Sequence, residues 1–226
     1  ILYNMYRTKR LINSEKFSNT ISLPEKSYPE AKRIKLNNIE DNGELISVLK
    51  RRRSQVKCGI DYKLDMDTIS HLCWAMYGMN IKNTRTAPSA GALYPCEIYL
   101  LSINSELGEG IFHYRPQSNS LEKISDNIPS MKEYLMSTKG FEHTSLVIFT
   151  TAMMNRDLFK SGDRGYRYML MEVGAMAQNL SLMATRFNLI STWIGGSSDI
   201  DVEKMLNIDG LNETLVNCVV IPANKV

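Results

Sequence analysis

Residues 158–184 read LFKSGDRGYRYMLMEVGAMAQNLSLMA and contain the longest periodic segment of the chain. Apolar and small side chains recur there at spacings of three and four residues, which is the period of one face of an α-helix. The recurring residues are Tyr166, Leu170, Val173, Ala177, Leu180 and Ala184. This pattern predicts one long amphipathic helix from Gly165 to Phe187.

Three cations crowd the start of this segment: Lys160, Arg164 and Arg167. The N-terminus of a helix carries a partial positive charge, so cations in its first turns are mildly unfavourable. One interpretation is structural, with the cations paired to Asp157, Asp163 or Glu172. The other is functional, with the positive charges kept for a negative partner or for chemistry.

The segments on either side of this helix have a mixture of helical and strand patterns. Helical patterns run from Gly43 to the basic residues at 51–54, and also over 65–79, 129–138 and 201–208. Strand patterns cover 97–103, 110–115, 145–153, 191–199 and 214–223. Because helices and strands mix without strict alternation, we expect an α+β fold with a sheet covered by helices.

The composition is that of an ordinary globular protein of 226 residues, with 43% apolar residues and a net charge of +3. Residues 1–40 are polar and irregular and are expected to form an N-terminal extension, while 41–226 form the main domain. The small net charge argues against nucleic acid as a partner. No apolar stretch is long enough to span a membrane and no signal peptide is visible, so we expect a cytoplasmic protein with no membrane partner.

Cysteine and histidine usage gives no support for a metal site. The four cysteines include no C-x-x-C pair, and none of the three histidines is spaced as a metal ligand with a cysteine. We therefore expect no metal and interpret the cysteines as reduced thiols.

Three further segments are candidates for binding chemistry. The run RRRS at 51–54 suits a phosphate, which arginine binds through paired charge-assisted hydrogen bonds, although a solvated basic face would look the same. The loop PSAGALYP at 88–95 would let backbone N–H groups approach a ligand, or is a plain turn. The glycines of WIGGSSD at 193–199 would let a flat ring lie against the backbone, or simply end a strand.

Taken together and in this order, these segments resemble the SagB-type branch of the nitroreductase-like flavoproteins, the azoline dehydrogenases. The resemblance covers roughly residues 41–222, and the combination of the 88–95 loop with the long helix is its most specific part. The matching stretches are RRRS at 51–54, RTAPSAGALYPCEIYL at 85–100, GIFHYRP at 110–116, the opening segment at 158–184 and WIGGSSD at 193–199.

The resemblance implies a nitroreductase-like fold with a central, mostly antiparallel sheet, in a homodimer that binds FMN at the subunit interface. Each FMN would contact residues from both chains. The implied residues are Arg52, Arg53 and Ser54 at the phosphate and ribityl chain, Pro88, Ser89, Ala90 and Gly91 flanking the ring from the partner subunit, and Gly195 and Gly196 at the hydride-accepting edge.

The resemblance also implies a catalytic Lys-Tyr pair just before the long helix, and here that pair is Lys160 and Ser161. Lys160 would take a proton while a hydride moves to FMN, because loss of a hydride from carbon needs a base for the accompanying proton. Serine is far less acidic than tyrosine and reaches less far, so Ser161 is a departure from the pattern. A second departure is Val56 followed by Lys57, where relatives often have another arginine.

Three functions follow from these patterns. The first is an FMN-dependent oxidoreductase that converts thiazoline or oxazoline to thiazole or oxazole in a ribosomally synthesised precursor peptide, with molecular oxygen as the final oxidant. The family then also implies cyclodehydratase subunits as partners. The second is a nitroreductase-like enzyme that uses NAD(P)H on small molecules. The third is a scaffold subunit of a peptide-modifying complex whose catalytic pair has been altered.

Overall fold

The computed structural model describes residues 28–40, 43–54, 62–136, 141 and 143–222. The chain divides into two units, residues 1–41 and residues 42–226. In the first unit the described residues, 28–40, form neither helix nor strand. Val56 and Lys57 lie outside the described residues.

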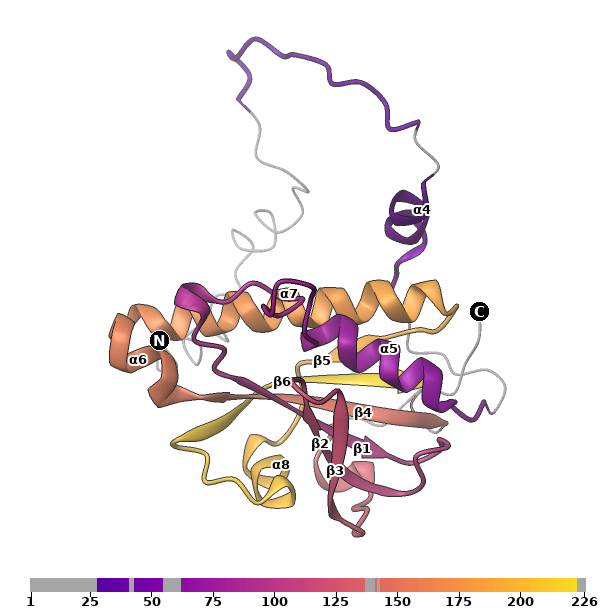
Figure 1. Ribbon diagram of the computed structural model, residues 1–226. Coiled ribbons are helices and arrows are strands. Elements are labelled where there is room, and N and C mark those ends of the chain that lie inside the picture. Colours follow the sequence, from indigo (N-terminus) through magenta and orange to yellow (C-terminus); the bar gives the residue numbers. More distant parts are fainter. Residues whose placement is uncertain (1–27, 41–42, 55–61, 137–140, 142, 223–226) are drawn as a thin grey trace, which may run out of the picture. The chain divides into compact units, whose positions relative to one another are not determined.

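The second unit is built on a six-stranded sheet with the order β3-β2-β1-β4-β6-β5 (Figure 1). Each pair of neighbouring strands is antiparallel, as the sequence led us to expect. The strands are β1 (Cys96–Ser102), β2 (Gly110–Arg115), β3 (Ser120–Ser125), β4 (Thr144–Met153), β5 (Thr192–Ile194) and β6 (Glu213–Pro222).

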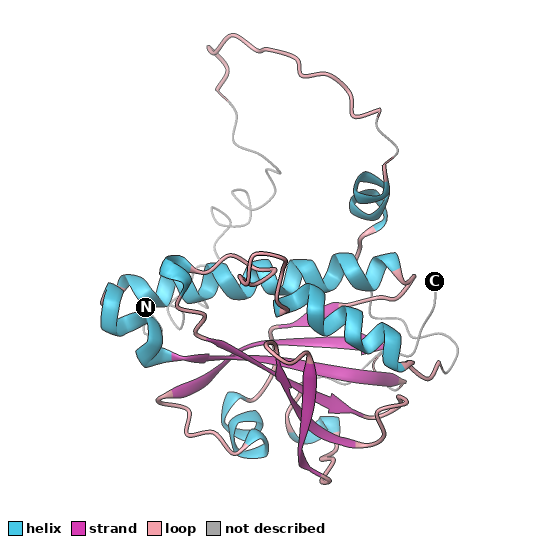
Figure 2. Cartoon of the chain, in the orientation of Figure 1, coloured by secondary structure: helices cyan, strands magenta, loops and turns pink. Residues whose placement is uncertain are grey.

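Helices cover both faces of this sheet. The helices α5 and α7 pack against each other and lie on one face, whereas α8 lies on the other (Figure 2). Together with the antiparallel sheet, this arrangement confirms the expected α+β class. The described helices are α4 (Glu44–Arg51), α5 (Met66–Tyr77), α6 (Met154–Ser161), α7 (Arg164–Arg186) and α8 (Asp199–Leu206), with 3₁₀ turns η1 (Ala90–Ala92) and η2 (Met131–Glu133).

The core is divided between the two faces by the alternation of side chains along the strands. In β4, Leu146 and Ile148 join the cluster under α5 and α7, while Val147 and Phe149 join the cluster on the α8 side. β4 is buried along nearly its whole length because it is central to the sheet and covered on both faces. The continuous apolar run at 145–153 therefore identified the central strand correctly.

The predicted helix at 129–138 is wrong, and only the 3₁₀ turn η2 is helical in its described part. The reason is that this segment forms backbone hydrogen bonds with the chain after β5 instead of the local hydrogen bonds of a helix. Tyr134 and Leu135 are buried, and the Met136 N–H donates to the Gly196 carbonyl at 2.8 Å. The Ser198 N–H donates to the Tyr134 carbonyl at 2.8 Å, so this segment pairs as extended chain with the segment after β5.

The helix at 65–79 begins where the sequence predicts. The Asp65 side chain accepts a hydrogen bond from the Thr68 N–H at 2.7 Å, so Asp65 rather than Asp67 caps α5. The strand β3, in contrast, was not predicted. It forms a hairpin with β2, and Asn119 takes a positive φ of 46° in the turn between them.

The opening segment contains two helices instead of one. α6 ends at Ser161, Gly162 has a positive φ of 55°, and α7 begins at Arg164. Lys160 therefore lies in the last turn of α6, where the negative end of the helix dipole favours a cation. The expectation that Lys160 stands at a helix start is wrong, whereas Arg164 and Arg167 do lie in the first turns of α7.

Candidate functional site

A basic pocket lies beside the C-terminal end of α7, formed with the end of α4. It has a volume of about 450 Å³ and has no acidic residue in its lining. The Arg51 guanidinium donates to the Asn188 side-chain oxygen at 2.8 Å, which fixes the end of α4 against the turn after α7. Its lining residues are Lys50, Arg51, Arg52, Arg53, Thr185, Asn188, Leu189 and Ile190.

Two of the three implied phosphate ligands, Arg52 and Arg53, thus share one concave site. Arg52 is half-buried, while Arg53 and Ser54 are exposed. Guanidinium groups that converge without an acidic neighbour are suited to a phosphate, because arginine can bind its oxygens in a bidentate manner. The donor set of this pocket fits the FMN phosphate.

The loop around Ser89 has an unusual backbone. Gly91, Ala92 and Tyr94 all have positive φ, at 64°, 55° and 47°. Such conformations cost energy for residues other than glycine and are often found at functional sites. The Ser89 hydroxyl oxygen accepts a hydrogen bond from the Tyr94 N–H at 2.9 Å, which closes the loop on itself.

Lys160 reaches this loop from the end of α6. A β-carbon placed on Gly91 would lie 2.8 Å from the Lys160 ammonium nitrogen, so the absence of a side chain makes room for the lysine. The structure therefore brings the implied catalytic lysine and the implied ring-flanking loop together within one chain. Pro88 is exposed at the edge of this loop, Ser89 and Ala90 are half-buried, and Ser161 is half-buried at the end of α6.

Beneath the loop, Glu172 of α7 is almost fully buried, with 2% of its surface exposed. The Tyr77 hydroxyl donates to Glu172 Oε1. Burial raises the pKa of Glu172, and the neighbouring Ser89 and Tyr77 hydroxyls only partly oppose this effect. Arg85 stacks near this group, with its guanidinium carbon 5.2 Å from the Tyr77 ring centre. Ser89 thus connects the surface loop to a buried acid.

A second buried acid, Asp157 of α6, has no exposed surface. Among the described residues, neither of its carboxyl oxygens has a hydrogen-bond partner. Burial raises the pKa of Asp157, and the Lys160 charge one helical turn away acts in the opposite direction. Glycine at 165 allows α7 to pack closely here, because a β-carbon would lie 2.9 Å from the Asp157 carbonyl.

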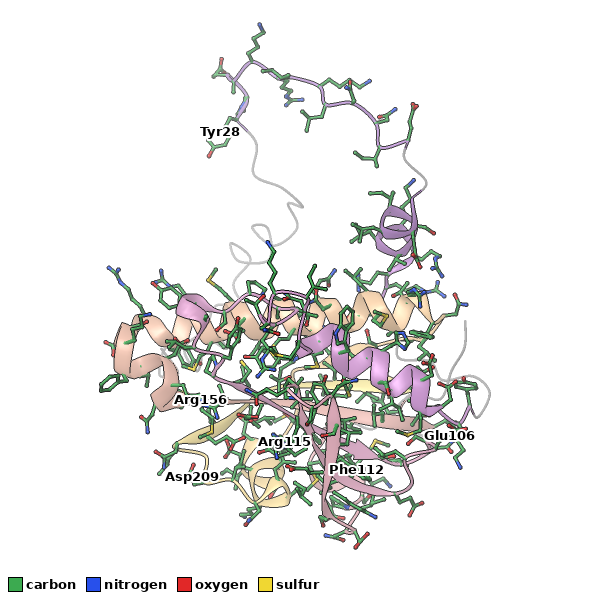
Figure 3. The ribbon with its side chains drawn as sticks, in the orientation of Figure 1. Tyr28, Glu106, Phe112, Arg115, Arg156 and Asp209 are labelled. Carbon is green, nitrogen blue, oxygen red and sulfur yellow. The ribbon has the colours of Figure 1, made fainter. Side chains whose placement is uncertain are left out.

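α6 is anchored to the sheet by Arg156 (Figure 3). Its guanidinium donates to Glu97 Oε1 at 2.7 Å and to the Tyr94 carbonyl at 3.1 Å. His113 Nε2 lies 3.0 Å from the other Glu97 oxygen, and this hydrogen bond raises the pKa of His113. Burial alone would raise the pKa of Glu97, but His113 and Arg156 lower it. This network fixes the helix that carries Lys160.

Gly195 and Gly196 follow β5, and neither has a positive φ. Their backbone conformations are therefore accessible to other residues, so the missing side chains matter more for space than for flexibility. A β-carbon on Gly195 would meet no atom within 4 Å, whereas one on Gly196 would lie 3.5 Å from the Met136 β-carbon. The open face at Gly195 fits the approach of a flat ring.

Apart from Gly195 and Gly196, which follow β5, the implied site residues fall into two groups along α7. The basic pocket lies at its C-terminal end, and the Lys160–Gly91 contact lies near its N-terminal end (Figure 1). Glu172, beneath the Ser89 loop, and Thr185, which lines the basic pocket, are about 20 Å apart along the helix axis at 1.5 Å per residue. The structure thus brings together the residues within each group but separates the two groups.

The structural interpretation of the cations is wrong. No ion pair joins Lys160, Arg164 or Arg167 to the acids at 157, 163 and 172, all of which are described. The sequence offered Asp157 and Glu172 as pairing partners for these cations, yet both acids are buried. For Glu172 the signal was available, because it shares the inward helical face with Met169, Val173 and Met176.

Three cysteines of the described chain, Cys73, Cys96 and Cys218, are buried free thiols, which agrees with the reduced state expected for them. Cys58 lies outside the described residues. No cluster of three or more potential metal ligands occurs among the described residues. Of the helices in the same part of the chain, none has both the length and the apolar character needed to cross a membrane.

With this fold and these two groups of residues in place, comparison with known proteins identifies the family. Residues 49–221 match the model of the Nitroreductase family. A protein of Methanocaldococcus jannaschii, provisionally named a nitroreductase, is 32% identical over 80% of this chain and 88% of its own length. The chain therefore belongs to the nitroreductase family.

Within this family, the chain is similar to the Microcin B17-processing protein McbC of Escherichia coli. The two are 34% identical over 70% of this chain, and the match spans 63% of the length of McbC, less than two thirds of it. The E. coli microcin synthetase McbBCD complex, solved with truncated pro-MccB17 bound, contains a chain of the same fold. That chain matches with a TM-score of 0.67 and 25% identity, over 92% of this chain and 81% of the other.

A protein from Ralstonia eutropha, provisionally described as a nitroreductase, also has this fold. It matches with a TM-score of 0.66 and 19% identity, over 88% of this chain and 93% of its own. Within the nitroreductase family the chain is thus similar to McbC and to a chain of the McbBCD complex, which supports an McbC-like branch of this fold.

Proposed function

We propose that this protein is an FMN-dependent oxidoreductase that dehydrogenates azolines in a ribosomally synthesised peptide, forming thiazoles or oxazoles. The observation that carries the proposal is the position of Lys160, whose ammonium nitrogen lies beside Gly91 in the loop expected to flank the FMN ring. When bound, FMN supplies the acceptor for a hydride, and molecular oxygen is the oxidant that completes the cycle. Similarity to McbC supports a peptide as the substrate.

In this proposal the residues of the chain have separate tasks. Arg52 and Arg53 bind the FMN phosphate, and the open backbone at Gly195 leaves room for the ring. Lys160 takes the proton that leaves the azoline ring carbon, as a general base held close to the substrate. The Arg156 anchor keeps α6, and with it Lys160, in a fixed position relative to the sheet.

The separation of the two groups along α7 supports a homodimer in which each FMN contacts both chains. The basic pocket of one chain and the Lys160–Gly91 contact of the other would form one complete site. The McbBCD complex further supports partner subunits of the cyclodehydratase kind. We place the protein in the cytoplasm, where such a complex would modify its precursor peptide.

The test is mass spectrometry of a cyclodehydrated precursor peptide incubated with the FMN-loaded protein. The proposal predicts the loss of two hydrogens per azoline ring. Lys160→Ala should retain FMN but lower the rate by at least about 100-fold, which is the usual contribution of a general base. Lys82→Ala removes an exposed lysine from a loop and should leave the rate unchanged.

Two other outcomes favour the alternative functions. The M. jannaschii relative favours a nitroreductase acting on small molecules, which would consume NADPH with a nitroaromatic compound and leave azolines unchanged. Ser161 in place of the family tyrosine favours a scaffold subunit, and this is the function that remains if neither reaction is observed. Normal azoline oxidation by Lys160→Ala would show that the base is a different residue.

A further inference from the structure

Two buried carboxyl groups lie behind Lys160, and the proposed reaction assigns neither of them a task. Asp157 and Glu172 have 0% and 2% of their surfaces exposed. Three of their four carboxyl oxygens have no hydrogen-bond partner among the described residues. Burying an ionised carboxylate without a partner is strongly unfavourable, so such groups usually shift their protonation instead.

The surroundings of the two acids contain few charges that could stabilise a double negative charge. The groups that face them are Tyr77 of α5, Arg85 and Ser89 of the loop, Cys96 of β1 and Lys160 of α6. Both carboxyls lie close enough to the buried Cys96 thiol to raise its pKa, after the larger effect of burial. The two acids therefore lie in one small, low-dielectric region.

Asp157 also acts on Glu172. Burial raises the pKa of both groups, and the negative charge of Asp157 raises the pKa of Glu172 further. Lys160 lowers the pKa of Asp157, and Arg85 lowers that of Glu172, but these are smaller effects. A negative charge on Asp157 therefore favours a protonated Glu172, so ionisation of both acids together is unfavourable.

We propose that Asp157 and Glu172 form a buried carboxyl pair that holds one proton at neutral pH and is coupled to the charge of Lys160. The coupling is that the positive charge of Lys160 lowers the pKa of Asp157 and so favours ionisation of the pair. The pair is a positioning element for Lys160 and does not itself touch the substrate.

The consequence for catalysis rests on the proposed function. Because the pair keeps one proton, it presents one buried negative charge behind Lys160 rather than two. That charge attracts the Lys160 side chain across the low-dielectric interior and helps to hold it at the Ser89–Gly91 loop, where the proposed function needs it.

The experiment needs neither FMN nor peptide, because it detects the proton directly. Infrared spectroscopy of the full chain records the C=O stretching band of protonated carboxyl groups as the pH is raised. We expect a band at neutral pH that is absent from the double variant Asp157→Asn/Glu172→Gln. Asp199, whose pKa burial also raises, will contribute equally to both proteins and cancel in the difference.

Two single variants test the coupling in opposite directions. Asp157→Asn removes the charge that raises the pKa of Glu172, so the remaining band should disappear at lower pH than in the unmodified protein. Lys160→Ala removes the charge that lowers the pKa of Asp157, so the band should persist to higher pH. Lys160 is exposed, so this variant should fold normally.

The matched controls are Asp163→Asn and Lys82→Ala, which make the same chemical changes at exposed positions and should leave the titration unchanged. The carboxyl pair is disproved if the difference band is missing at neutral pH. Its coupling to Lys160 is disproved if Lys160→Ala titrates like Lys82→Ala. Because azoline oxidation is measured separately, an expected band in a protein without this activity would reject the proposed function and leave the pair established.

Discussion

The two ends of α7 hold opposite kinds of charge in opposite surroundings. At the C-terminal end, the arginines at 51–53 line an open pocket with no acidic residue, and Arg53 is exposed. Beside its N-terminal half, Asp157 of α6 and Glu172 of α7 are buried, and three of their oxygens have no partner in the described chain. One helix thus connects a cationic, hydrated site to an acidic, water-excluded site.

The difference indicates that the two ends are suited to different roles. Exposed arginines attract and bind an anion but are screened by water and salt. Buried acids interact with nearby charges much more strongly, because the interior has a low dielectric constant. The first end is suited to holding a phosphorylated cofactor and the second to controlling a proton, and the predictions below test this division.

The largest effect is expected when the two ends are disabled in different chains. Lys160→Ala disables one end and should lose at least about 100-fold in azoline oxidation, because it removes the general base. Arg52→Ala/Arg53→Ala disables the other end and should lose azoline oxidation because FMN binding is weakened. If each site draws on two chains, as a symmetric dimer interface permits, an equal mixture of dissociated and reassociated chains should recover about one quarter of the normal rate. The rate is measured from the mass loss of the peptide.

The control for this experiment is a chain that carries all three substitutions. It has neither end intact, so it should rescue neither single-end variant. Mixing the triple variant with the unmodified chain should give mixed dimers in which neither site is complete. The rate should therefore not exceed that of the unmodified dimers that remain. If the two single-end variants recover no activity on mixing, each site is complete within one chain, and the two ends of α7 do not cooperate across an interface.

The next largest effect is expected from a substitution at Gly91. The substitution removes space for Lys160 and also strains the backbone, and these two consequences can be measured separately. Gly91→Ala places a β-carbon 2.8 Å from the lysine nitrogen and also forces alanine into a φ of +64°. We expect a loss of about 1 kcal/mol in stability from the backbone and roughly a tenfold loss of activity from displacement of the lysine. Thermal unfolding and the azoline assay measure the two effects.

Gly108→Ala is the matched control for this change. Gly108 has a φ of +79°, and a β-carbon there would meet no atom within 4 Å. It should therefore lose similar stability and keep its activity. Equal loss of activity in both variants would mean that strain alone, and not the contact with Lys160, explains the effect at Gly91.

Much of the fold could be predicted from the sequence because its strongest patterns are local. The spacing of Leu170, Val173 and Ala177 predicted α7, and the apolar run at 145–153 predicted the central strand. β3 was missed because its sequence, SLEKIS, is mostly exposed and has little hydrophobic alternation. The 129–138 helix failed because long-range pairing with 196–198 outweighs local helix propensity.

The sequence motifs could name the residues of the candidate site but not their arrangement in space. The motifs named the loop at 88–91, the run at 51–54 and Lys160, but their division between two ends of α7 depends on the three-dimensional fold. One interpretation of the sequence offered the two buried acids as pairing partners for the nearby cations. Their burial follows from how closely α6 and α7 pack at Gly165, which sequence spacing alone does not reveal.

The smallest effect is expected at Arg53, and it tests whether the basic end behaves as an exposed site. Arg53→Ala should weaken FMN binding roughly fivefold, since hydrogen bonds to a charged group contribute modestly when water competes for them. Added salt should weaken FMN binding to the unmodified protein and have less effect on the variant, because exposed charges are screened.

Arg115→Ala is the control for this change. It removes an exposed arginine on β2 that pairs with Glu122, and it should leave FMN affinity unchanged. Fluorescence titration with FMN at several salt concentrations measures these affinities. If Arg53→Ala binds FMN as the unmodified protein does, the basic pocket is a solvated face that does not bind FMN. Only the buried acids would then distinguish the two ends of α7.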